Sequence, residues 1–94
     1  MAYEFQFITD DRVGGTKKKL LAMDKRLKVA LKKFDGVTLK DYATREVHFP
    51  VSHNEPANKQ WRIRYVVEKR GNKPTWDELM REINKIQAPY YRRV

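Results

Sequence analysis

Three stretches of the chain alternate hydrophobic and polar residues with a period of two, the pattern of half-buried β-strands. They cover residues 3–8, about 44–51 and 61–70. The polar segment between the second and third, residues 52–60, predicts the loop of a hairpin. Residues 37–42 are ambiguous between a short strand and a helical turn.

Two other stretches repeat hydrophobic residues at intervals of three and four, which is typical of an amphipathic helix. The second of these helices begins at the capping box Thr75–Glu78 and ends before Pro89. The first covers residues 17–34, after Thr16 as N-cap, and ends at Asp35-Gly36. Its hydrophobic stripe consists of Leu20, Met23, Leu27, Ala30, Leu31 and Phe34.

The order β-α-β-β-α predicts a two-layer α+β domain, with a three-stranded, mainly antiparallel sheet and both helices on one face. Residues 1–89 form this single domain, because 94 residues are too few for two cores, and residues 90–94 form a basic aromatic tail. A right-handed crossover could place the first strand parallel to a neighbour. The opposite face of the sheet would carry Gln6, Glu46, His48, Arg62 and Arg64. The predicted core consists of Phe5, Phe7, Leu20, Met23, Leu27, Phe34, Val47, Phe49, Trp61, Ile63, Tyr65, Leu79, Ile83 and Ile86.

Positive charge is concentrated in the first predicted helix. Residues 17–33 hold eight lysines and arginines against one acid, Asp24, for a net charge of +7 in a chain of net charge +9. A solvated helix face normally mixes signs, because oppositely charged residues four apart stabilise each other. Lysines in the first turn also oppose the helix dipole, whereas an anion bound there would reverse that effect. This helix therefore predicts a phosphate-binding surface made of Lys17, Lys18, Lys19, Lys25, Arg26, Lys32 and Lys33.

A second basic block covers residues 59–73, with six lysines and arginines against one glutamate. Alternation along a strand would point Arg62 and Arg64 the same way, which suits phosphate oxygens or base edges. Cross-strand pairing of both arginines with Glu46 is an equally good alternative. We expect Arg62, Arg64, Lys69 and Arg70 to extend the binding surface if the fold brings the two blocks together.

The C-terminal tail combines aromatic rings with arginines. Tyr90 and Tyr91 could stack on unpaired bases. Terminal tyrosines also fold back onto a core or fray, and the sequence leaves these alternatives open.

Catalysis and metal binding are poorly supported. The chain has no cysteine, which excludes a disulfide scaffold, a thiolate nucleophile and a cysteine zinc site. His48 and His53, near Glu46 and Glu55, lack the spacing of a metal-binding motif, and Asp10-Asp11 lacks the third acid of a nuclease. We expect no enzyme activity, no metal and no cofactor.

We expect no membrane partner, because the chain lacks a run of 18 hydrophobic residues and the stripe of the first helix is needed for the core. The absence of cysteine and of room for a signal peptide favours a cytoplasmic location.

The sequence therefore predicts a non-enzymatic nucleic-acid-binding protein that contacts the phosphate backbone of DNA or RNA with little sequence specificity. The alternative is a small inhibitor or adaptor whose basic face docks an acidic surface of another protein, such as a nucleic-acid enzyme. Its interface anchors would be Leu21, Val29, Tyr90 and Tyr91.

Overall fold

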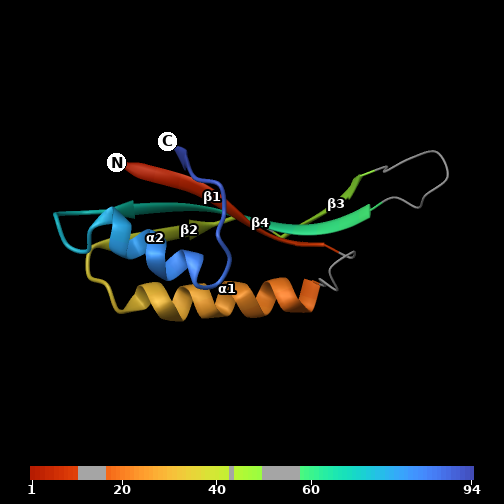
Figure 1. Ribbon diagram of the computed structural model, residues 1–94, viewed down its shortest axis with the longest axis horizontal. Coiled ribbons are helices and arrows are strands. Elements are labelled where there is room, and N and C mark those ends of the chain that lie inside the picture. Colours follow the sequence, from red (N-terminus) through yellow and green to blue (C-terminus); the bar gives the residue numbers. More distant parts are fainter. Residues whose placement is uncertain (11–16, 43, 50–57) are drawn as a thin grey trace.

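The computed structural model describes residues 1–10, 17–42, 44–49 and 58–94 and confirms a small α+β domain (Figure 1). An antiparallel sheet forms one layer, and both helices lie on the same face of it. The elements are β1 (Ala2–Asp10), α1 (Lys17–Lys32), β2 (Val37–Asp41), β3 (Arg45–Phe49), β4 (Asn58–Lys69), α2 (Trp76–Asn84) and β5 (Arg92–Arg93).

The sheet has five strands in the described part of the chain, whereas the sequence predicts three. β4 pairs with β1 on one side and with both β2 and β3 on the other, and β5 adds to the far edge of β1. The ambiguous residues 37–42 thus contain a strand, and part of the predicted tail is another. The prediction of a crossover that places β1 parallel to a neighbour is wrong, because every described strand pairing is antiparallel. The predicted hairpin loop was too long, since β4 begins at Asn58; residues 50–57 lie outside the description.

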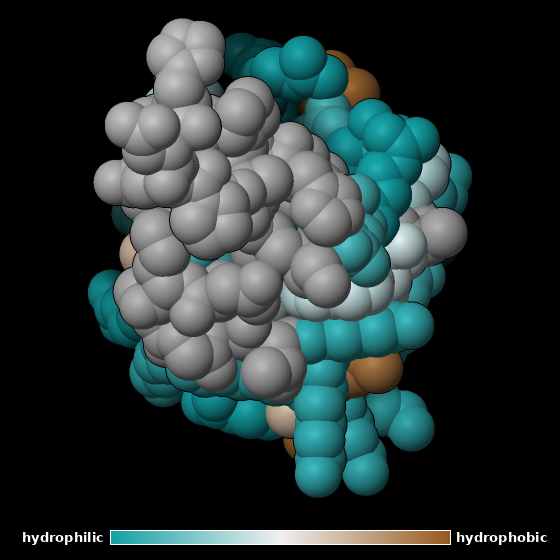
Figure 2. Space-filling view, turned by 90° about the vertical axis from the view of Figure 1, so that its right-hand side faces the viewer, coloured by the Kyte–Doolittle hydropathy of each residue, from teal (hydrophilic) through white to brown (hydrophobic). Residues whose placement is uncertain are grey.

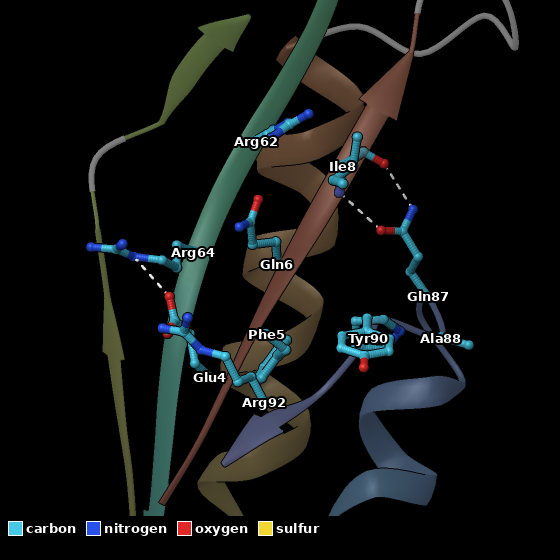
Figure 3. Close-up of a pocket in the computed structure, with 11 residues that line it drawn as sticks. Glu4, Phe5, Gln6, Ile8, Arg62, Arg64, Gln87, Ala88, Tyr90 and Arg92 are labelled. Carbon is cyan, nitrogen blue, oxygen red and sulfur yellow. Dashed lines mark hydrogen bonds and ion pairs between the residues drawn. The ribbon is translucent and has the colours of Figure 1, made fainter. Parts of the chain in front are cut away.

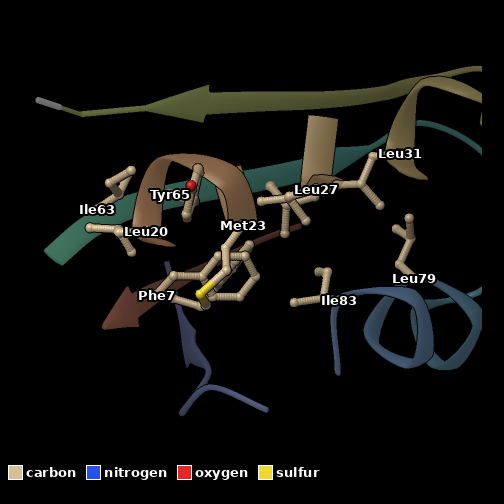
Figure 4. Close-up of a cluster of buried hydrophobic side chains, with 11 residues drawn as sticks. Phe7, Leu20, Met23, Leu27, Leu31, Ile63, Tyr65, Leu79 and Ile83 are labelled. Carbon is tan, nitrogen blue, oxygen red and sulfur yellow. The ribbon is translucent and has the colours of Figure 1, made fainter. Parts of the chain in front are cut away.

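The hydrophobic core lies between the sheet and the two helices (Figure 4). Leu31 and Val67 are buried in addition to the core residues expected from the sequence. Phe34, Trp61 and Ile86 are only partly buried and pack against the core from its edges. The side chains of Val47 and Phe49 lie outside the description. The predicted core residues that are fully confirmed are Phe5, Phe7, Leu20, Met23, Leu27, Ile63, Tyr65, Leu79 and Ile83.

The one acid of the basic helix ties α1 to the sheet. The Tyr65 hydroxyl on β4 donates a hydrogen bond of 2.6 Å to Asp24 Oδ1. Lys28 Nζ lies 3.0 Å from Asp24 Oδ2 and 2.9 Å from Asp41 Oδ2 on β2. Burial and the neighbouring Asp24 carboxylate raise the pKa of Tyr65, so this phenol stays protonated and donates. Asp24 and Lys28 therefore hold three elements together.

The N-terminus of α2 follows the predicted capping box. The Thr75 hydroxyl accepts a hydrogen bond of 3.2 Å from the Glu78 backbone N–H, and the first turn carries Asp77 and Glu78. The helix ends at Asn84, five residues before Pro89. The first turn of α1 has no acid and carries lysines instead, so its charges oppose the helix dipole, whereas those of α2 complement it.

Candidate nucleic-acid interface

The face of α1 that points away from the sheet carries a row of lysines. Lys18, Lys25 and Lys32 recur every seven residues, which places them on one line at intervals of about 10 Å. All three are exposed, and so is the adjacent Arg26. Hydrophilic side chains project from this side of the molecule, at the bottom of the view in Figure 2. The buried stripe of Leu20, Met23, Leu27 and Leu31 sets this orientation.

The cations of α1 differ in their partners. Lys28 is held by two aspartates, and Lys33 Nζ lies 3.3 Å from the Glu82 carboxylate on α2. Lys17 Nζ lies 5.3 Å from the centroid of the Trp61 ring, which makes a cation–π contact. Within the described residues, four cations of α1 have no carboxylate partner: Lys18, Lys25, Arg26 and Lys32. Lys19 is also exposed, but it does have a contact.

The predicted anion site at the start of α1 is described only in part. Lys17, Lys18 and Lys19 are exposed in the first turn, as a phosphate site requires. The predicted N-cap, Thr16, and the two glycines before it lie outside the described residues.

An open hydrophobic groove of about 570 Å³ runs between α1 and α2. Its hydrophobic lining comes from Ala22, Val29, Ala30 and Ile86, and its rim includes both Lys25 and Arg26. Val29 is 68% exposed and Leu21 is 45% exposed, so neither contributes much to the core. The basic surface of α1 therefore also offers hydrophobic contacts.

The second basic block does not join the first. Arg64 alternates on β4 with Ile63 and Tyr65, which are buried against the helices, so Arg64 points to the open face of the sheet. Arg62 lies on the same open face. The lysine row of α1 faces away from the sheet on the other side, so the two surfaces are opposite each other.

The arginines on the open face contact Glu4, Tyr42 and Gln60. Arg64 Nε lies 3.3 Å from Glu4 Oε1, and its guanidinium lies 4.1 Å from the Tyr42 ring centroid. Arg62 donates two hydrogen bonds, of 3.2 and 2.8 Å, to Gln60 Oε1. The strand register places Glu46 opposite Trp61 and Arg45 opposite Arg62, so the prediction of Glu46 on the open face was wrong by one position.

The other two predicted contact residues of the second block, Lys69 and Arg70, follow further along the chain. Lys69 is seven residues from Arg62 along β4, about 23 Å. Its ammonium donates a hydrogen bond of 2.9 Å to the Gly71 carbonyl and lies 5.3 Å from the Trp76 ring centroid. Arg70 is exposed in the following turn.

The two tail tyrosines have different environments. The Tyr91 ring packs against Phe5, with 5.7 Å between centroids, and its hydroxyl donates a hydrogen bond of 2.8 Å to Asn84 Oδ1. Burial raises the pKa of Tyr91 to about 12. The Tyr90 side chain is 90% exposed. Tyr91 therefore packs against the core, whereas Tyr90 does not.

Tyr90 lines a groove of about 590 Å³ on the open face of the sheet (Figure 3). β1 and β4 form its floor, and the segment 87–92 forms its wall. The Gln87 amide fixes this wall, because it donates to the Ile8 carbonyl at 2.8 Å and accepts from the Ile8 N–H at 2.9 Å. Arg92 lies across from Glu4 and pairs with its carboxylate. Sequence reasoning missed Glu4, Gln87 and Arg92 as parts of this groove. The spacing of Tyr90 and Arg92, two residues apart, is the one signal in the sequence that could have placed them on the same face.

The structure adds two negative findings, and both apply to the described residues alone. These residues include no group of three or more histidine, cysteine, aspartate or glutamate side chains placed to hold a metal ion. No helix among them is long and hydrophobic enough to cross a membrane. His53, Glu55 and Asp11, which the sequence raised as metal candidates, lie outside the description.

In comparisons with known proteins, no family model, no curated protein and no solved structure matches this chain.

Proposed function

We propose that this protein binds the phosphate backbone of nucleic acid through the outward face of α1, with little sequence specificity and without catalysis. The observation that carries the proposal is the row of Lys18, Lys25 and Lys32 with the adjacent Arg26. These four exposed cations have no carboxylate partner among the described residues. The acid that does occur in α1 is engaged by Tyr65 and Lys28. A helix face that only needed to be solvated would gain from acids at these positions.

The dimensions of the row suit a nucleic-acid backbone. From Lys18 to Lys32 the helix rises about 21 Å. One strand of B-DNA places roughly six phosphates along that length, since its phosphates are spaced by about 3.4 Å along the axis. Lysine side chains are long and flexible enough to follow such a path. Four neutralised phosphates give a slope of about −3.6 for the logarithm of the affinity against the logarithm of the salt concentration.

The test is a triple substitution, Lys18→Gln, Lys25→Gln and Lys32→Gln, with labelled duplex DNA and RNA as probes. Glutamine keeps a high helix propensity and relieves like-charge repulsion, so we expect the fold to be retained. The salt slope should become shallower by about 2.7, and affinity at low salt should fall at least about 100-fold. The control is Lys40→Gln, Lys73→Gln and Arg81→Gln, which removes the same charge from exposed positions outside α1. If both variants lost the same affinity, the loss would reflect net charge alone, and the proposed surface would be refuted.

A second candidate function is the docking of an acidic protein segment. The observation that favours it is the hydrophobic groove beside the lysine row, where Val29 is 68% exposed. Hydrophobic anchors surrounded by cations are typical of an interface with an acidic, amphipathic partner.

The substitution Val29→Lys separates the two functions. It adds a cation to the nucleic-acid surface, so duplex affinity should stay the same or rise, with a salt slope steeper by up to about 0.9. The same change puts a charge into the hydrophobic groove and would weaken the binding of an acidic amphipathic peptide there. Lower duplex affinity for the folded Val29→Lys variant would contradict nucleic-acid binding through this face of α1.

A further inference from the structure

We propose that the groove on the open face of the sheet binds an unpaired nucleotide segment, with the Tyr90 ring stacking on a base and arginines contacting its phosphates. The inference rests on the proposed function, because it takes nucleic acid as the ligand. It adds a second site on the opposite face of the domain and a strand form, single-stranded, for that site.

The Tyr90 ring is the first observation. At 90% exposure it contributes almost nothing to the core, in contrast to Tyr91 beside it, which packs on Phe5. The wall that carries Tyr90 is held at both ends, by the Gln87 amide on Ile8 and by the pairing of Arg92 with Glu4. The ring is therefore presented from a fixed backbone at the edge of the groove (Figure 3). Stacking on such a ring tolerates any base, because every base has a π-face.

The charge of the groove is the second observation. Arg62, Arg64 and Arg92 line it against one acid, Glu4, which leaves two net positive charges. Glu4 is 14% exposed in its side chain and contacts both Arg64 and Arg92, so it holds their guanidinium groups in place rather than presenting a carboxylate to the ligand. Gln60 holds Arg62 in the same way. Planar guanidinium forks fixed by carboxyl and amide oxygens are suited to phosphate.

The size and shape of the groove favour a single strand. Its volume of about 590 Å³ lies within the range of sites that hold small organic ligands, so a nucleotide fits. A base inside a duplex is stacked on both sides and cannot accept the Tyr90 ring without being extruded. An unpaired base has that face available. The lysine row of α1 needs no exposed base, so the two faces would prefer different strand forms.

The experiment uses a fluorescein-labelled single strand of about eight nucleotides, of DNA and of RNA, at about 50 mM salt. Tyr90→Ala should lower its affinity by between about 5-fold and 150-fold, which is the range for loss of one stacked base. Tyr90→Phe keeps the ring and should bind as the unmodified protein does. Because the side chain is almost fully exposed, neither substitution should alter the fold. Binding of the labelled duplex should be unchanged in both variants.

A competition and an NMR experiment locate the single strand. Saturating unlabelled duplex should leave the short strand bound, and the strand should shift backbone amide signals of Gln6, Arg64 and Tyr90 rather than those of Lys25 and Lys32. Displacement by the duplex, shifts confined to α1, or unchanged affinity in Tyr90→Ala would overturn the inference.

The two proposals fail separately. If the triple lysine variant of α1 binds duplex normally while Tyr90→Ala loses the single strand, the proposed function of α1 fails and the groove remains. If the lysine variant loses duplex while Tyr90→Ala binds the single strand normally, the groove fails and the function of α1 remains.

Discussion

The contact between Tyr65 and Asp24 gives the sharpest prediction about stability, because it joins the basic helix to the central strand. The perturbation is Asp24→Ala, compared with Asp24→Asn and Tyr65→Phe. The Asp24 side chain is 16% exposed and accepts the Tyr65 hydroxyl at 2.6 Å. Asparagine keeps an oxygen acceptor for that hydroxyl, whereas alanine leaves the hydroxyl without one.

The expected magnitudes follow from these contacts. A hydrogen bond to a charged group contributes about 1.5–3 kcal/mol to the free energy of unfolding. The ion pair with the half-exposed Lys28 adds at most about 1 kcal/mol, because solvent screens it. We expect Asp24→Ala to cost about 2–4 kcal/mol, and Asp24→Asn about 1 kcal/mol, since it loses the charge but keeps the acceptor. Tyr65→Phe removes the same hydrogen bond and should cost about 1.5–3 kcal/mol.

The assay is urea unfolding followed by tryptophan fluorescence, with the double variant Tyr65→Phe/Asp24→Ala completing a thermodynamic cycle. The pair should show a coupling energy of about 1–2 kcal/mol. Single and double effects that add to within about 0.5 kcal/mol would refute the reasoning, as would an Asp24→Ala variant of unchanged stability.

The same variants test the role of the acid in function. Asp24→Asn raises the net charge of residues 17–33 from +7 to +8. If Asp24 is structural, duplex affinity at temperatures where the variant is folded should not fall.

Two further predictions concern the C-terminal segment. Gln87→Ala removes two hydrogen bonds to the β1 backbone, of 2.9 and 2.8 Å. It should lower the free energy of unfolding by about 1–2 kcal/mol and accelerate hydrogen exchange at the Ile8 amide. An Ile8 amide that is as protected as in the unmodified protein would contradict the contact. Burial raises the pKa of Tyr91 from 10.0 to about 12, so its stabilising effect should be complete below pH 10 and be lost as the pH rises towards about 12. In an ultraviolet titration, the Tyr91→Phe variant should lack one tyrosine that ionises with a raised pKa. If the variant instead lacks a tyrosine with a pKa near 10.0, the burial of Tyr91 would be contradicted.

Much of the fold was predictable because the strong signals are local. The alternation through Phe5 and Phe7 predicted β1, and the capping box at Thr75 marked the start of α2. β5 was missed, because two arginines in an extended backbone carry no hydrophobic pattern, and their pairing with β1 depends on a contact across almost the whole chain. The face of Glu46 was misassigned for a similar reason. The alternation within one strand does not specify its register against a neighbour, and a shift of one residue moves every side chain to the opposite face.

The candidate site was predictable residue by residue but not as an assembly. The exposed row on α1 followed from the helical period. The idea of one combined basic side depended on tertiary placement, and a sheet covered by helices on one face puts the lysines of α1 and Arg64 on opposite sides. The role of Asp24 was also hidden, since its partner Tyr65 is 41 residues away in the sequence.

The most direct test of nucleic-acid binding through α1 is the affinity of the unmodified protein for a labelled duplex at about 50 and 200 mM salt. Four neutralised phosphates predict an affinity that falls by roughly 150-fold between the two concentrations. Absence of binding at about 50 mM salt, or an affinity that barely changes with salt, would contradict the proposed function.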